Sequence, residues 1–62
     1  MTVSASDIHL GRCYVTGYRE VRRVVDLDVS EVTYETIGAG SIVSVSREKF
    51  AAEVDREVGC PD

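Results

Sequence analysis

The chain has 62 residues and a net charge of −4, from 7 basic and 11 acidic side chains. This length supports one domain, and a domain of about 60 residues buries only about 60% of its unfolded surface, so the hydrophobic core is thin. The negative charge disfavours general binding to nucleic acid, and no apolar run approaches the roughly 20 residues that span a bilayer.

Residues 1–8 are mostly small and polar, and they predict a loose N-terminal lead-in. Residues 10–46 predict a series of antiparallel strands. The first strand starts near Leu10 or Arg12 and ends before Gly17. Gly17 and Tyr18 supply a turn in which a positive φ costs little.

A second strand follows this turn. In its downstream half, Val25, Leu27 and Val29 share the buried face, whereas Asp26 and Asp28 point to water. A two-residue apolar period of this kind is typical of a half-buried strand.

The parity of the apolar positions changes after Val29, because the next apolar pair is Val32 and Tyr34. A tight turn or a bulge at this point explains the change. The sequence Gly-Ala-Gly-Ser at residues 38–41 supplies another turn, and after it Val43 and Val45 are expected to face inward. The pattern therefore predicts three consecutive antiparallel strands.

The last element is a helix predicted over residues 46–58, followed by a tail at residues 59–62. Ser46 is the expected N-cap, and Glu48 in the first turn complements the helix dipole. Gly59 stands where the helix is expected to end.

Phe50, Val54 and Val58 recur every four residues and form one narrow apolar stripe on this helix. Docking of the stripe on another protein is an alternative, but a chain this short can hardly leave Phe50 unburied. The predicted fold class is therefore α+β, a small and strongly bent antiparallel sheet of four or five strands packed by one C-terminal α-helix.

Four segments of the chain resemble the short bacterial and phage proteins that combine an SH3-like small β-barrel with a terminal helix. The segments are Gly11-Arg12-Cys13-Tyr14, Gly17-Tyr18-Arg19-Glu20-Val21, Val32-Thr33-Tyr34, and Ser46 to Phe50. The resemblance implies a barrel-like fold. It carries no catalytic residues to this sequence, so function is left open.

Cys13 and Cys60 can form one disulfide, but the absence of a signal peptide in residues 1–10 predicts a cytoplasmic protein, whose cysteines stay as free thiols. A zinc site built on these cysteines, His9 and a carboxylate lacks the tight Cys-x-x-Cys spacing. His9 is the only histidine, and a core this small leaves little room for a ligand cleft of about 300 Å³. We therefore expect no enzyme, no catalytic residues, no metal and no cofactor.

Acidic residues dominate the region of the second and third strands. They share one face if these strands form a hairpin, although like charges that face each other across a ladder destabilise it. The four carboxylates are Asp26, Asp28, Glu31 and Glu35. They suggest an interface with a basic protein surface, and the competing interpretation is an acidic face that only aids solubility.

The first function hypothesis is therefore a non-enzymatic, acidic protein-binding module. Its specific form is an inhibitor from a phage or mobile element, of the anti-CRISPR or anti-restriction type, which mimics DNA on the basic surface of a host protein.

The alternative is a small-barrel nucleic-acid-binding protein with a local arginine and tyrosine surface that pairs with phosphates and stacks on bases. Its candidate residues are Arg19, Arg22, Arg23, Tyr14 and Tyr18. The simpler interpretation is that the tyrosines pack and the arginines are solvated. Self-pairing into a homodimer through an open sheet edge is a third expectation, whereas a membrane partner is not expected.

Overall fold

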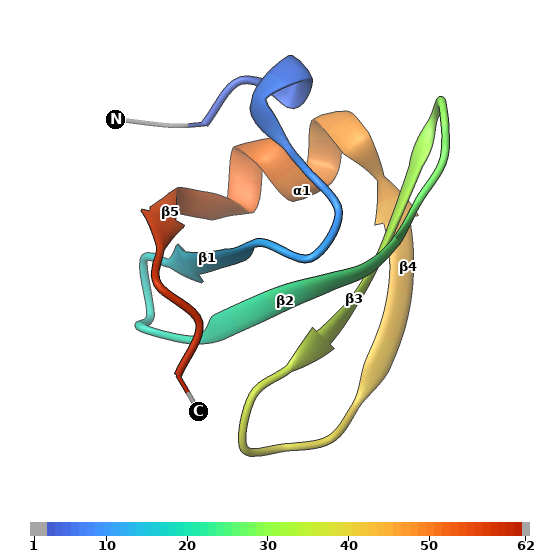
Figure 1. The fold of residues 1–62 in the computed structure, drawn as a ribbon. Helices are drawn as coiled ribbons and strands as arrows, with labels where there is room; N and C mark the ends of the chain where they lie inside the picture. Colours follow the sequence, from blue (N-terminus) through green and yellow to red (C-terminus); the bar gives the residue numbers. More distant parts are fainter. Residues whose placement is uncertain (1–2, 62) are drawn as a thin grey trace.

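The computed structural model describes residues 3–61 and shows five antiparallel strands in the sheet order β4-β3-β2-β1-β5. The strands are β1 (Cys13–Thr16), β2 (Val21–Leu27), β3 (Glu31–Thr36), β4 (Ile42–Ser46) and β5 (Val54–Val58). A 3₁₀ turn, η1 (Ala5–Asp7), precedes the sheet, and the helix α1 (Arg47–Glu53) connects β4 to β5 (Figure 1). The α+β class is confirmed. The described sheet is open, because β4 and β5 form its two edges and do not pair with each other.

The core lies between the bent sheet and α1, and Phe50 is at its centre. The Phe50 ring is completely buried, with its centroid 5.6 Å from that of Tyr14 and 5.4 Å from that of Tyr34. The other buried members of the cluster are Ile8, Val24, Val32, Ala51 and Val54. The expected burial of Phe50 against the sheet is thus confirmed.

The helix is shorter than predicted. It begins after Ser46, whose Oγ accepts a hydrogen bond from the Lys49 backbone N–H, as expected for an N-cap. It ends at Glu53, because Val54 has an extended backbone, with φ −89° and ψ 150°. Residues 54–58 form β5 and pair with β1, so the prediction of helix over residues 46–58 is wrong in its second half. The sequence Val-Asp-Arg-Glu-Val fits a helical stripe but also a half-exposed strand, and pairing with β1 selects the strand.

The N-terminal segment is not a loose lead-in over the residues that the structure describes. Ile8 is 1% exposed and belongs to the core. The buried Tyr14 hydroxyl donates a hydrogen bond to the Asp7 carbonyl oxygen and accepts one from the His9 backbone N–H. Residues 1, 2 and 62, which the expected lead-in and tail included, lie outside the described residues.

A bulge in β2 changes which residues face the core. The register of β2 with β3 shifts between Val24 and Asp26, so Val25 is the extra residue. Val24 and Leu27 consequently face the core, whereas Val25 is 42% exposed. The expectation that Val25, Leu27 and Val29 share a buried face is therefore wrong.

The predicted turns are present. In the β3–β4 turn, Gly38 and Gly40 have φ values of 93° and 72°, which glycine adopts without strain. In the β1–β2 turn, the residue with positive φ is Arg19 rather than Gly17, at 66°. The Thr16 hydroxyl fixes this turn, because its oxygen accepts hydrogen bonds from two backbone N–H groups beyond it.

Candidate protein-binding site

Three of the four predicted acidic residues gather at the tip of the β2–β3 hairpin. Asp26, Asp28 and Glu31 are all exposed, and the last two flank the two-residue turn, which the hydrogen bond from the Asp28 N–H to the Glu31 carbonyl closes at 2.8 Å. Within residues 3–61 no ion pair engages these three carboxylates. The hairpin projects from the body of the molecule, so its tip is free to contact another surface (Figure 1).

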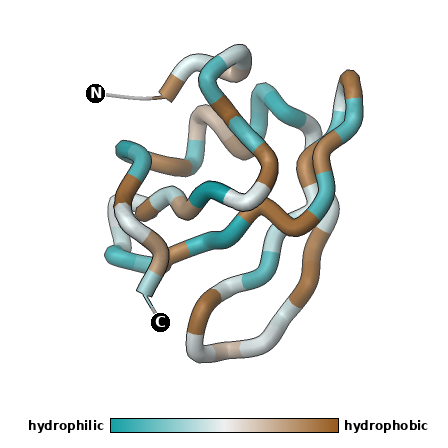
Figure 2. The backbone as a smooth tube through the Cα atoms, in the orientation of Figure 1, coloured by the Kyte–Doolittle hydropathy of each residue, from teal (hydrophilic) through white to brown (hydrophobic). Residues whose placement is uncertain are grey.

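The apex of this tip is apolar. Val29 is 89% exposed between Asp28 and Ser30, and Figure 2 shows the hairpin end as a brown apex with hydrophilic chain beside it. The two-residue apolar period predicts Val29 on the buried face, so this exposed position was not predicted. A β-branched residue inside a turn, where Gly, Asn, Asp and Ser are the usual residues, is the signal that marks it. We name Asp26, Asp28, Val29 and Glu31 the acidic tip.

The two aspartates of the hairpin tip also form hydrogen bonds within the tip itself. One carboxylate oxygen of Asp26 accepts a hydrogen bond from the Leu27 N–H at 2.9 Å, and one of Asp28 accepts from the Val29 N–H at 2.8 Å. Arg47 also contacts the tip, because its guanidinium donates a hydrogen bond of 3.3 Å to the Asp28 carbonyl. The second oxygen of each aspartate remains available to a partner.

Glu35 does not belong to the acidic tip. It lies opposite Arg23 on β2 and Ile42 on β4, at the other end of the hairpin. The register also places Thr33, not a carboxylate, opposite Asp26. No carboxylate therefore lies directly opposite Asp26, so the expected repulsion of like charges across the ladder is absent at this position.

The predicted arginine and tyrosine surface is not assembled. Tyr14 is completely buried, whereas Tyr18 is 95% exposed in the β1–β2 turn. Arg22 lies opposite Tyr14, while its neighbour Arg23 points to the other face of the strand. The two tyrosines thus cannot offer one stacking platform, and Arg19 stands beside Tyr18 in the turn.

Arg22 is held within the fold. Its side chain is 12% exposed, forms ion pairs of 2.8 Å with Glu53 and 3.2 Å with Glu20, and lies 4.5 Å from the centre of the Tyr34 ring. Burial alone would lower the pKa of Arg22, but these hydrogen bonds raise it above its ordinary value. The guanidinium therefore binds two carboxylates of the protein itself and joins α1 to β2.

Burial raises the pKa of the Tyr14 hydroxyl above its ordinary value, although the hydrogen bond from His9 acts in the opposite direction. Above about pH 10 the unfolded chain loses this proton while the folded chain retains it, so the free energy of unfolding falls as the pH rises. We expect a steeper alkaline loss of stability in the natural chain than in Tyr14→Phe. Urea unfolding midpoints from about pH 8 to about pH 11 measure this difference, and equal slopes would contradict it.

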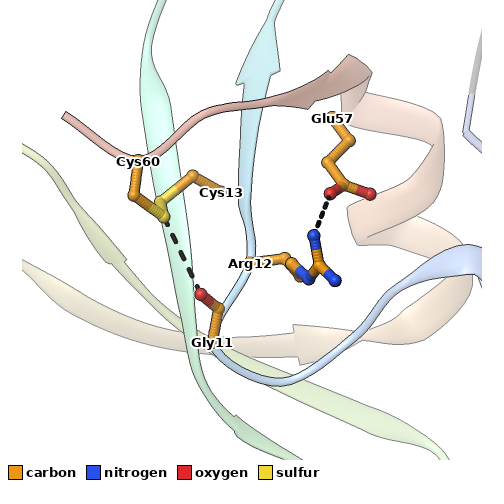
Figure 3. Close-up of a disulfide and its surroundings, with 5 residues drawn as sticks. All are labelled: Gly11, Arg12, Cys13, Glu57 and Cys60. Atoms are coloured by element: carbon orange, nitrogen blue, oxygen red, sulfur yellow. Dashed lines mark hydrogen bonds and ion pairs between the residues drawn. A yellow bond between two sulfur atoms is a disulfide. The ribbon is translucent and has the colours of Figure 1, made fainter.

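Cys13 and Cys60 form a disulfide, so the expectation of free thiols is wrong for this structure. The link joins β1 to the segment after β5 (Figure 3). Cys60 Sγ lies 3.7 Å from the Gly11 carbonyl oxygen, and beside it Arg12 forms an exposed ion pair of 3.1 Å with Glu57. Both cysteines are thus committed to a covalent contact, and His9 has no cysteine partner for metal binding or nucleophilic chemistry.

The structure contains a larger depression than the small core suggested. An open hollow of about 650 Å³ lies between the N-terminal segment and β5. It is lined by Val3, Ser4, Asp7, His9, Tyr14, Asp55, Arg56 and Glu57. Among residues 3–61 no group of three or more His, Cys, Asp or Glu side chains has an arrangement that holds a metal ion.

Comparison with known proteins found no match among family models, curated proteins or solved structures. The helices of the described residues are too short and too polar for any of them to cross a membrane. The fold and the surface chemistry therefore carry the functional argument.

Proposed function

We propose that this chain is a non-enzymatic protein-binding module, and that its acidic tip binds a basic surface on another protein. The observation that supports the proposal is the exposed apex of Val29 between carboxylates that no described ion pair neutralises. An apolar contact surrounded by charge is a common arrangement at interfaces, where the apolar centre supplies affinity and the charges supply orientation and rate.

The charge on the tip predicts a specific response to charge reversal. Asp26→Lys with Glu31→Lys should weaken binding about a hundredfold or more, since like charges juxtaposed at an interface cost several kcal/mol. The measurement is capture of partners from a lysate by tagged protein, followed by titration of the purified partner. High salt should release the partner, and nuclease treatment should not.

The matched control is Asp7→Lys with Glu57→Lys. It makes the same change in net charge beside the open hollow, at two carboxylates outside the acidic tip, and it breaks the exposed ion pair of Glu57 with Arg12. The proposal requires that this control retains the partner. Equal capture by both double variants would show that the acidic tip is not the binding surface, and recovery that depends on intact nucleic acid would favour the alternative function.

Val29→Ser tests the apolar part of the tip without changing its charge. We expect weaker binding at every salt concentration, with the salt dependence of the natural chain.

The narrower proposal, an inhibitor that mimics DNA in the cytoplasm, requires binding by the reduced protein, because disulfides are rare in the cytosol. Titration with and without reductant decides this point, and loss of binding on reduction restricts the function to an oxidising compartment.

A further inference from the structure

The outer edge of β4 has backbone groups that no described strand uses. Two backbone hydrogen bonds of 3.0 Å mark the ends of the ladder between β4 and β3. The Thr36 N–H donates to the Ser41 carbonyl at one end, and the Arg47 N–H donates to the Ser30 carbonyl at the other. Bonded positions alternate along an antiparallel ladder. Val43 and Val45 therefore use their backbone groups toward β3, whereas Ile42 and Ser44 point theirs away from the sheet.

This edge lacks the usual protection. Proteins protect edge strands with charged side chains, proline or bulges, but β4 reads Ile-Val-Ser-Val-Ser and pairs with β3 in an uninterrupted register. Ile42 is 65% exposed and Val43 is 41% exposed. The opposite edge, β5, carries Asp55, Arg56 and Glu57. In Figure 1 β4 runs along the margin of the molecule.

We propose that β4 pairs antiparallel with β4 of a second copy of this chain, around a two-fold axis at Ser44. This register makes the strand complementary to itself, because Val43 lies opposite the partner's Val45 and Ile42 opposite the partner's Ser46. Ser44 meets the partner's Ser44, and the two residues exchange both outward backbone hydrogen bonds. The two sheets become continuous across the axis.

The uncharged β4 edge is where charge least opposes the approach of a second copy. Each chain carries a net charge of −4, so two copies repel at most approaches, and β4 is an uncharged strand where no like charges meet. A single five-residue strand buries less than the roughly 1,200 Å² of a stable interface. The dimer is therefore weak and reversible. Added salt strengthens it by screening the net repulsion, whereas salt weakens binding through the acidic tip.

The test uses opposite charges at the two-fold axis. Ser44→Lys alone and Ser44→Glu alone each place like charges opposite each other, and each should weaken the dimer at least about fivefold. An equimolar mixture should recover dimerisation, because lysine then faces glutamate. Sedimentation equilibrium up to millimolar chain concentration, with circular dichroism to confirm folding, measures both effects.

Ser44→Ala is the matched control. It removes the 2.8 Å hydrogen bond between the Thr33 and Ser44 hydroxyls but keeps the backbone N–H of residue 44, so it should dimerise as the natural chain does. A natural chain that stays monomeric at millimolar concentration overturns the proposal. If each charged variant alone dimerises as well as the natural chain, the β4 interface is wrong. If both variants are folded but their mixture stays monomeric, the proposed register is wrong.

Discussion

Phe50→Ala is expected to remove a large part of the free energy of unfolding of this chain. Phe50 is completely buried and its ring contacts those of Tyr14 and Tyr34, so the substitution removes the centre of the core. Replacing a buried phenylalanine by alanine costs about 3–5 kcal/mol. At roughly 0.05–0.15 kcal/mol per residue, a domain of this length has a total free energy of unfolding of about 3–9 kcal/mol.

Urea unfolding followed by circular dichroism measures this loss, and Phe50→Leu supplies a graded variant that retains enough stability for a full transition. The matched control is Tyr18→Ala. Tyr18 is also aromatic, but it is 95% exposed, and its removal should change the free energy of unfolding by no more than about 0.5 kcal/mol. Equal transition midpoints for Phe50→Ala and Tyr18→Ala would contradict the described core.

Opening the Cys13–Cys60 disulfide is expected to lower the free energy of unfolding by about 4 kcal/mol. The two cysteines are 47 residues apart, so the link closes most of the chain into one loop. Such a loop reduces the conformational entropy of the unfolded chain. Because this effect acts on the unfolded state, the reduced protein should keep the same fold while it becomes much less stable.

Cys60→Ser is the preferred variant, because Cys13 is completely buried and its replacement would also disturb packing. Urea unfolding with and without reductant measures the effect. Reductant should bring the natural chain to the stability of Cys60→Ser and leave the variant unchanged. An unchanged natural chain under reductant would mean that the link contributes nothing to folding.

The two stabilising features compensate for the small size of the chain. The core has one phenylalanine and no tryptophan, and the disulfide joins β1 to the segment after β5 at the edge of the sheet. Small domains with limited cores commonly rely on such a link. The acidic tip and the β4 edge both lie away from the disulfide, so substitutions there test binding without removing the main sources of stability.

The candidate site was predictable in part. Asp26, Asp28 and Glu31 are marked in the sequence by the lack of any basic residue among them, and their placement around one hairpin follows from the turn after Asp28. Glu35 was grouped with them because charge along the chain does not show which residue lies across the ladder. Its neighbour Arg23 is brought there only by the pairing of β2 with β3.

Local signals alone determined the α+β class, the turns at residues 17–18 and 38–41, and the start of the helix after Ser46. Alternating apolar residues, glycine at a positive φ and an N-cap hydroxyl each act within a few residues, so the sequence displays them directly. Tertiary structure decided the end of the helix, the burial of Ile8, the bulge at Val25 and the disulfide. Each of these depends on partners distant in the chain, as in the pairing of Cys13 with Val58, and the free energy of such long-range contacts overrides an ambiguous local pattern.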